Sequence, residues 1–535
     1  MNRFIFIFIV LIFSGCHSFD ADRGLNIFHY NQASGISSLD PAFASVQSNM
    51  WAVSQLYNGL VQTDSNLKIV PCIAKQWEIS SDGLTYIFHL RNDVFFHNNT
   101  VFKNGTGRKL IADDVVYSFN RLMDSTIASP GSWVFKGKVD SLIPFSAAND
   151  STFVLKLNKP FMSLLGILSM QYCFIVPHEA VEKFGKDFRN HPVGTGPFQF
   201  QYWKENEALT LLRNPNYFEF DGTNHLPFLD GVYITFIDNK IGEFLEFKRG
   251  GLDFVSDVDV GMRNDLLTPA GELNINYQGK IRLQKSSYLN TEYIGFNLTD
   301  STNHLLTNVK LRQALSYAID RKALVTYLRN NVGYAGNDGF VPIGLKGYNS
   351  TLIKGFDYNP VLAKNLLAEA GYPNGKNLEA LTLKCSSTAE AMCNFLAAEW
   401  KDIGVTIKVE VMQSKALNQE MRKGTVQLFR ASWLADYPDP ESFLSLFYSQ
   451  NGAPPNYTRF QNLTFDKEYE QCISQTNDSL RLFAYQHLDS LAISQCPVIV
   501  LYYDQVLRFV NPRISGFTNN ALNLLDLRRV KKSRS

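Results

Sequence analysis

The residue spacings typical of hydrolysis, redox chemistry or metal binding are incomplete or missing in this 535-residue sequence. His178 is followed by Glu182, where a metalloprotease helix needs a second histidine. Gly194 and Gly196 lack the third glycine of a dinucleotide-binding turn, and Pro197 blocks the helix that should follow. Neither a phosphate-binding loop nor a Gly-x-Ser-x-Gly turn occurs. The missing motifs therefore disfavour an enzyme, and we expect neither a cofactor nor a metal site.

The cysteines give no sign of zinc or thioredoxin-type chemistry, because none is spaced as Cys-x-x-Cys. Cys16 lies near the N-terminus, and the other six are Cys72, Cys173, Cys385, Cys393, Cys472 and Cys496. An exported chain with an even number of cysteines can form disulfides, but the sequence does not choose the pairs. Disulfides and buried free thiols both stay open.

The N-terminus has the pattern of an export signal. Arg3 precedes ten apolar residues, 4–13, and Ser-Gly-Cys follows. Ten helical residues span about 15 Å, half of a bilayer core, so this segment is too short to cross a membrane. We predict a signal peptide over 1–15 and a spacer over 16–23. Because small residues and Cys16 follow the apolar run directly, the pattern resembles a bacterial lipobox, which implies a lipid anchor on Cys16. A plain signal peptide is the alternative.

The composition is that of a large globular chain. Lys and Arg number 51 against 50 Asp and Glu, a formal charge of +1, and 45% of the residues are hydrophobic. A chain this long forms two or three domains with substantial cores. Because a net charge of +1 provides no strong positive field, we expect no nucleic-acid partner.

The periodicity predicts the elements that position any site. Residues 77–90 alternate around a Ser-Ser-Asp-Gly turn and predict a β-hairpin. Asp113 and Asp114 are expected to cap a helix whose apolar face carries Val116, Phe119, Leu122 and Met123.

The C-terminal half shows helices and a β-α-β-β pattern. One helix is predicted to run from Leu311 through Leu328, and another from Pro360 to Gly371. Residues 378–433 are predicted to form a strand, a helix and two further strands in that order. This order implies a parallel strand pair in an α/β domain.

Several segments together resemble one family. Residues 74–97 read AKQWEISSDGLTYIFHLRNDVFFH and residues 110–119 read LIADDVVYSF. Further matches follow in order: SLDP at 38–41, VGTGPF at 193–198, RNPNYF at 213–218, AIDRKAL at 318–324 and ADYPDP at 435–440. The chain resembles the extracellular solute-binding proteins of family 5, the oligopeptide and dipeptide receptors of bacterial ABC importers.

The resemblance implies an α/β, two-lobed fold like that of periplasmic binding proteins, type II and cluster C, which closes on its ligand by hinge motion. Lobe one would comprise 24–60, 193–284 and 505–535, with an extra domain, 61–192, packed on it. Lobe two would comprise 285–504, and the hinge crossings would lie near 284 and 504. The resemblance also implies an exported monomer, on the periplasmic or cell-surface side, that delivers short peptides to ABC permease subunits.

A receptor that ignores peptide side chains must bind the groups that all peptides share. A strand edge pairs with their amides, a carboxylate neutralises the ammonium, and an arginine matches the carboxylate. The resemblance places Asp436 at the ammonium and Arg430 at the carboxylate. It places the peptide-pairing strand at Ser432, Trp433 and Leu434.

Three further residues are assigned by the same resemblance. Ser45 and Gln47 would lie on a facing strand of lobe one, and Tyr502, near the second hinge crossing, would face the ligand. Where members of the family place an acidic residue, this chain has Ser45.

Each site residue also has a purely structural interpretation. Asp436 precedes a proline-containing turn, where aspartate often caps its own backbone. Arg430 fits a structural ion pair, Trp433 fits a core position, and Tyr502 fits a strand core.

Three functions stay open from the sequence. The first is a lipid-anchored peptide receptor. The second is the same fold with a nickel chelate, haem, opine or sugar as ligand, which the retained Asp436 disfavours. The third is an exported hydrolase, which the missing catalytic motifs disfavour.

Overall fold

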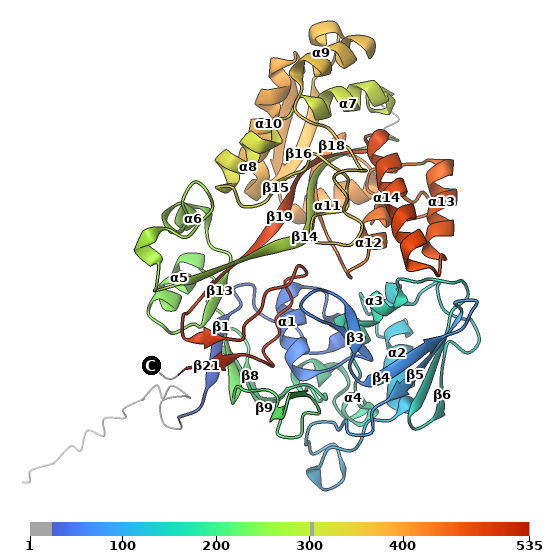
Figure 1. Cartoon of the computed structure of the whole chain (residues 1–535), viewed down its shortest axis with the longest axis vertical. Helices are drawn as coiled ribbons and strands as arrows, with labels where there is room; N and C mark the ends of the chain where they lie inside the picture. Colours follow the sequence, from blue (N-terminus) through green and yellow to red (C-terminus); the bar gives the residue numbers. More distant parts are fainter. Residues whose placement is uncertain (1–23, 300–303, 534–535) are drawn as a thin grey trace, which may run out of the picture.

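In the computed structural model, residues 24–299 and 304–533 are described, and they form a mixed α/β structure. Figure 1 shows a lower and an upper body joined by two long strands, β14 (Arg282–Phe296) and β19 (Val498–Val510). These strands pair in antiparallel fashion from Arg282–Val510 to Gly295–Val498, with register shifts between Ser287 and Thr291 and between Glu292 and Tyr293. The predicted hinge crossings lie on this pair, and the hinge motion stays a prediction.

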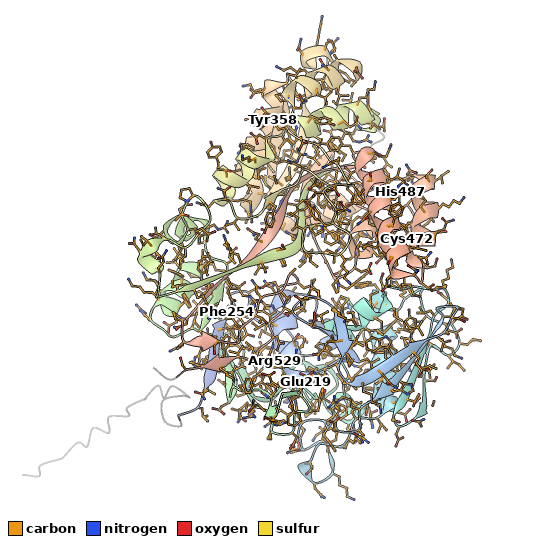
Figure 2. The ribbon with its side chains drawn as sticks, in the orientation of Figure 1. Glu219, Phe254, Tyr358, Cys472, His487 and Arg529 are labelled. Atoms are coloured by element: carbon orange, nitrogen blue, oxygen red, sulfur yellow. The ribbon has the colours of Figure 1, made fainter. Side chains whose placement is uncertain are left out.

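The lower body combines segments that are far apart in the sequence. Its four-stranded sheet has the order β1 (Ile27–Asn31), β12 (Gly231–Thr235), β9 (Ala208–Arg213) and β8 (Phe198–Lys204). Helix α1 (Gln47–Leu56) is attached to the C-terminal segment, because Trp51 Nε1 donates to the carbonyl of Asn523 at 2.8 Å. Figure 2 places Phe254 in this body. Its ring packs against Phe28 at 5.7 Å and Phe517 at 5.0 Å between centroids.

Segment 61–192 contains the predicted hairpin, which is confirmed. Strands β4 (Ala74–Ile79) and β5 (Thr85–Leu90) pair in antiparallel fashion, and β7 (Thr152–Lys156) and β6 (Phe145–Asn149) extend the sheet. Helix α2 (Ala112–Met123) is also confirmed, but two details of the prediction were wrong. Ile111 is its N-cap, and Asp114 Oδ2 instead accepts from the Ile111 N–H at 2.9 Å.

The buried face of α2 differs from the predicted one as well. Met123 is exposed and Val116 is only partly buried, whereas Val115, Phe119 and Leu122 are buried. The face differs because packing against neighbouring elements, and not apolar spacing alone, decides which side of the helix is buried.

The upper body is built on a mixed sheet with the order β13 (Phe254–Ser256), β19, β14, β18 (Leu428–Leu434), β16 (Leu381–Ser386) and β17 (Ile407–Met412). Helix α10 (Glu390–Asp402) connects β16 to β17, and these strands are parallel, which confirms the predicted β-α-β unit. Strand β18 joins β16 in parallel and β14 in antiparallel orientation.

The predicted long helix from Leu311 to Leu328 is two helices. Helix α7 (Val309–Tyr317) ends before Asp320, and α8 (Arg321–Arg329) begins after it. Asp320 has a non-helical ψ of 87°, and its side chain accepts from the N–H of Ala323. An N-cap of this kind begins a new helix, and apolar spacing alone does not detect it. Helix α9 (Pro360–Glu369) follows the predicted proline-first pattern, with Asn359 as its cap.

The remaining elements are shorter or lie at the periphery. The helices are α3 (Leu164–Leu168), α4 (His178–Phe184), α5 (Lys240–Lys248), α6 (Val260–Leu266), α11 (Ser414–Lys423), α12 (Glu441–Leu444), α13 (Leu463–Ile473) and α14 (Asp478–Ser494). The strands are β2 (Val61–Thr63), β3 (Ile69–Pro71), β10 (Phe220–Asp221), β11 (Asn224–His225), β15 (Tyr334–Ala335), β20 (Ile514–Ser515) and β21 (Lys531–Lys532). Across residues 24–299 and 304–533, no helix combines the length and apolar character needed to cross a bilayer.

The glycines of the 193–198 motif are required by close backbone packing. A Cβ atom at Gly196 would lie 2.4 Å from the carbonyl carbon of Leu56, and one at Gly194 would lie 2.1 Å from the Leu56 oxygen. The Gly196 N–H donates to that same oxygen at 2.9 Å. The motif therefore packs against and holds the end of α1.

Gly196→Ala is expected to lower the free energy of unfolding by about 1–3 kcal/mol, because the backbone of α1 cannot yield to the added methyl group. Urea denaturation measures this change. Gly452→Ala is the matched control, since a Cβ atom there meets nothing within 4 Å. Equal stability of the two variants would contradict the packing argument.

Candidate functional site

Strand β18 offers an unpaired edge on the upper body. It pairs with β14 along its whole length, from Leu428 to Leu434, but with β16 only at Leu428 and Phe429. Within the described part of the chain, the other edge from Arg430 to Leu434 has no partner strand. Such an edge pairs readily with an extended peptide, because its N–H and C=O groups are unused.

Asp436 follows this edge with an unpaired carboxylate. Its backbone is held, since the Asp436 N–H donates to Ser442 Oγ at 3.1 Å. Its carboxylate has no hydrogen-bond or ion-pair partner among residues 24–299 and 304–533, and the side chain is exposed. In the following turn, Asp439 and not Asp436 acts as the cap, because Asp439 Oδ1 accepts from the Glu441 N–H at 2.9 Å. The structural interpretation of Asp436 as a cap therefore has no support.

The surrounding protein shifts the ionisation of Asp436. Desolvation by the surrounding protein, followed by the charge of Glu441, raises the pKa of Asp436 from 3.8 to about 6. The side chain is nevertheless exposed to solvent. An ionised carboxylate in such a place favours a bound cation.

Segment 61–192 packs directly against the turn that carries Asp436. The rings of Trp133 and Tyr437 stack with centroids 6.4 Å apart, and a Cβ atom at Gly166 would lie 3.3 Å from Tyr437 Cδ2. The Met162 N–H donates to the carbonyl of Ile473 at 3.1 Å. The two bodies thus meet beside Asp436.

Arg430 is already paired within the upper body. Its guanidinium donates to Glu292 on the neighbouring strand β14, and the Glu292 side chain is buried. Burial raises the pKa of Glu292, whereas the charge of Arg430 lowers it. Asn290 Nδ2 also donates to Glu292 at 3.1 Å. The structure thus shows the ion pair that was one interpretation of Arg430, and contact with a ligand carboxylate stays a prediction.

The peptide-pairing residues differ in exposure. Ser432 and Leu434 are exposed beside the free edge. Trp433 is half-buried against the upper core, and its Nε1 donates to the carbonyl of Ser442 at 2.7 Å. The indole therefore braces the Asp436 turn, and its role in a side-chain pocket stays a prediction.

The predicted facing strand at Ser45 and Gln47 was wrong. Ser45 lies in a loop, and Gln47 is the first residue of α1. The cause is that the 3-10 turn Pro41–Phe43 and helix α1 leave only three residues between them. Both side chains are exposed, and Gln47 hydrogen-bonds to the hydroxyl of Tyr288 on β14, so it does reach the junction of the two bodies.

Tyr502 lies in the strand core. Its side chain is 3% exposed, its hydroxyl accepts from Arg329 Nη1 at 3.0 Å, and the Arg329 guanidinium lies 4.3 Å from the ring centroid. Arg329 also pairs with Asp504 at 2.5 Å. The prediction that Tyr502 contacts the ligand has no support from this placement.

The cysteine predictions separate into two parts. Cys16 lies outside the described residues. The six cysteines of the described part are free and buried, which matches the free-thiol alternative.

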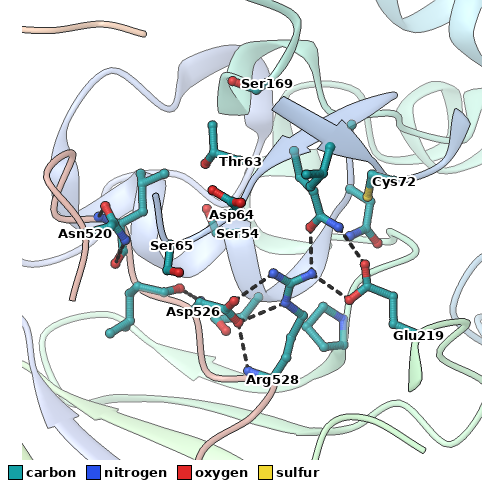
Figure 3. Close-up of a pocket in the computed structure, with 18 of the residues that line it drawn as sticks. Ser54, Thr63, Asp64, Ser65, Cys72, Ser169, Glu219, Asn520, Asp526 and Arg528 are labelled. Atoms are coloured by element: carbon teal, nitrogen blue, oxygen red, sulfur yellow. Dashed lines mark hydrogen bonds and ion pairs between the residues drawn. The ribbon is translucent and has the colours of Figure 1, made fainter. Parts of the chain in front are cut away.

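A separate cavity of about 460 Å³ lies in the lower body. Figure 3 shows hydroxyl and amide side chains around it, and Arg528 on its wall. Arg528 Nη1 donates to Glu219 Oε2 at 2.6 Å and Arg528 Nε to Asp526 Oδ1 at 2.9 Å, so its charge is compensated. Because none of the residues predicted to bind ligand lines this cavity, we place the candidate site at Asp436 and the β18 edge.

Comparison with known proteins identifies the family. The model for bacterial extracellular solute-binding proteins, family 5, matches residues 68–455. Heme-binding protein A of Haemophilus influenzae is 30% identical over 514 residues, which cover 92% of this chain and 90% of that protein. The chain belongs to family 5 of the bacterial extracellular solute-binding proteins. Members of this family are the substrate-binding receptors of ABC importers.

Two further family members extend the comparison. The dipeptide-binding protein of Escherichia coli is 25% identical over 489 residues, which cover 87% of each chain. The solved structure of HbpA2 from Haemophilus parasuis aligns with a TM-score of 0.83 at 26% identity, covering 95% of this chain and all (100%) of that one. The two-lobed α/β fold expected from the sequence is thereby confirmed.

Sequence reasoning did not find every residue around Asp436. Trp133 and Gly166 contact Tyr437, the residue after Asp436, from a distant segment, and no local pattern distinguishes them from ordinary packing residues.

Proposed function

We propose that this chain is a receptor that captures short peptides between its two lobes and delivers them to the permease of an ABC importer. The single observation that carries the proposal is the unpaired carboxylate of Asp436 at the end of an unpaired strand edge. The edge satisfies the amides of an extended peptide, and the carboxylate neutralises its ammonium. Lobe one comprises 24–60, 193–284 and 505–535, and lobe two comprises 285–504. Segment 61–192 is an extra domain.

A second ligand class, haem, is supported by the name of the 30% identical relative. Isothermal titration with di- to pentapeptides and with haem, together with native mass spectrometry of the purified protein, distinguishes the two. Stoichiometric peptide binding supports the proposal. Haem as the only ligand bound or co-purified would replace it, and turnover of a peptide would point to a hydrolase.

We also propose that the mature protein is held at the outer face of a membrane by lipid on Cys16. The support is the apolar run followed by Ser-Gly-Cys. Mass spectrometry of the mature N-terminus tests this point: a diacylglyceryl group on Cys16 supports it, and cleavage elsewhere without lipid contradicts it.

Peptide affinity is expected to fall as the pH drops below about 6, the pKa of Asp436 without ligand. A bound ammonium favours the ionised carboxylate, so binding below this pH must first remove a proton. Affinity at pH 4 should be about a hundredfold lower than at pH 7. Titration calorimetry across this range measures the profile, and a profile that is flat between pH 4 and 7 would contradict the role of Asp436.

A further inference from the structure

Two buried cysteines lie at the turn between strand β16 and helix α10. Along β16 the buried side chains are Leu381, Leu383 and Cys385, and along α10 they begin with Cys393. The short 3-10 turn Ser387–Ala389 reverses the chain, and Figure 1 shows α10 beside β16 in the upper body. The last buried residue of the strand therefore meets the first buried residue of the helix.

The two side chains converge on each other. The thiols of Cys385 and Cys393 lie within hydrogen-bonding reach, both residues have an exposed fraction of 0%, and both belong to the buried cluster of the upper body. The thiol of Cys496, in contrast, donates to the carbonyl of Val498 at 3.7 Å. A disulfide requires two cysteines whose side chains point at one another, and Cys385 and Cys393 meet this requirement.

Cys385 lies where β16 separates from β18. The last pair of residues between these two strands is Lys384 with Phe429, directly before the free edge of β18 begins. Strand β16 continues for two residues beside β17, up to Ser386 with Met412. A bond from Cys385 to α10 thus fastens the end of β16 next to the candidate site.

We propose that Cys385 and Cys393 form a disulfide in the exported protein, which joins the end of β16 to the first turn of α10. The pair of thiols in the structure is then its reduced form. Compartments outside the cytoplasm maintain disulfides, whereas the cytoplasm keeps thiols reduced. The inference rests on the export of the chain and is independent of which ligand the protein binds.

The bond forms by thiol–disulfide exchange, with a disulfide of an oxidoreductase or of glutathione as the oxidant. One thiolate of the pair attacks a sulfur of that disulfide, which gives a mixed disulfide and releases the other sulfur as a thiol. The second thiolate then attacks the cysteine sulfur of the mixed disulfide and releases the remaining oxidant thiol. The pair loses two electrons and two protons, and the oxidant gains both.

The exchange must take place while the chain folds. Both thiols are fully buried in the folded protein, and burial raises the pKa of each, so neither is an accessible thiolate there. Before α10 covers the strand, both thiols are open to the oxidant. Once formed, the disulfide is protected from reductants by the same burial.

The test is mass spectrometry of the full chain, exported by a bacterial host and alkylated in denaturant without reduction. Both cysteines lie in one tryptic peptide, residues 385–401, because it follows Lys384, ends at Lys401 and has no basic residue between. This peptide should carry no alkyl group and be two hydrogens lighter than the dithiol, and after reduction it should take up two alkyl groups. The peptide with Cys496 should be alkylated without reduction.

Cys393→Ala is the matched variant, because it leaves Cys385 without a partner. Its 385–401 peptide should take up one alkyl group before reduction. Reduction in denaturant followed by refolding should lower the melting temperature of wild type by about 5 °C, as expected for loss of a short cross-link, and leave that of the variant unchanged.

The wild-type peptide decides the inference even if the variant folds poorly. Two alkyl groups on the unreduced 385–401 peptide overturn it, and so does a bond from either cysteine to a different one. Either result leaves the proposed peptide function untouched, because peptide binding is measured separately by calorimetry.

Discussion

Asp436→Asn is expected to weaken the binding of a free-amine peptide by at least about a hundredfold, because truncating one partner of a buried charge pair costs 2–5 kcal/mol or more. Asparagine keeps the shape of the side chain and loses only the charge. Without ligand, the carboxylate is crowded by protein and its pKa is about 6, so ionised Asp436 works against the compact state at neutral pH. The unliganded variant should therefore be as stable as wild type or more stable.

Calorimetry for affinity and thermal denaturation for stability separate these two effects. Asp402→Asn is the control, since Asp402 is exposed at the end of α10 and its side chain has no hydrogen-bond or ion-pair partner in the described part of the chain. The fall in affinity at low pH that is expected for wild type should also disappear in Asp436→Asn. Retention of wild-type affinity by this variant would remove the ammonium site from the proposal.

Arg430→Gln is expected to lower the free energy of unfolding by about 3–5 kcal/mol at pH 8, because it leaves Glu292 buried without its partner. Burial already raises the pKa of Glu292, and loss of Arg430 raises it further. A carboxyl group whose pKa is higher in the folded state than in the unfolded chain destabilises the fold when it is ionised. This loss of folding free energy grows as the pH rises above the pKa of the unfolded chain. The destabilisation should therefore be smaller at pH 5 than at pH 8.

The double variant Arg430→Gln/Glu292→Gln supplies the control, because it removes both charges and keeps two amides of similar size. Its free energy of unfolding, measured by urea denaturation, should recover much of what Arg430→Gln loses. If the change in the double variant equals the sum of the changes in the two single variants, the two residues are not coupled. The same folded variant tests the ligand role of Arg430. If Arg430 binds the peptide carboxylate, the double variant should no longer distinguish trialanine from its C-terminal amide.

Local patterns predicted those elements whose causes lie within a few residues. The hairpin at 77–90 follows from alternation around a four-residue turn, and α9 follows from Asn359-Pro360 at its start. The β16–α10–β17 unit follows from the change of period between strand and helix. The predictions failed where a single cap outweighed periodicity, as at Asp320, or where a short turn replaced a strand, as at Ser45.

The family could be inferred from residue order alone, because the matching motifs are contiguous and each acts over a short stretch of backbone. The ligand role of Asp436 stays a prediction. The partner of Arg430 lies 138 residues away on β14, and Trp133 meets Tyr437, beside Asp436, only because two bodies pack together. Charge pairing and desolvation depend on which distant segments become neighbours in the folded protein. The spacing of residues along the chain does not predict these neighbours. Tertiary structure therefore decided which of the predicted charges is already paired and which one has no partner in the described part of the chain.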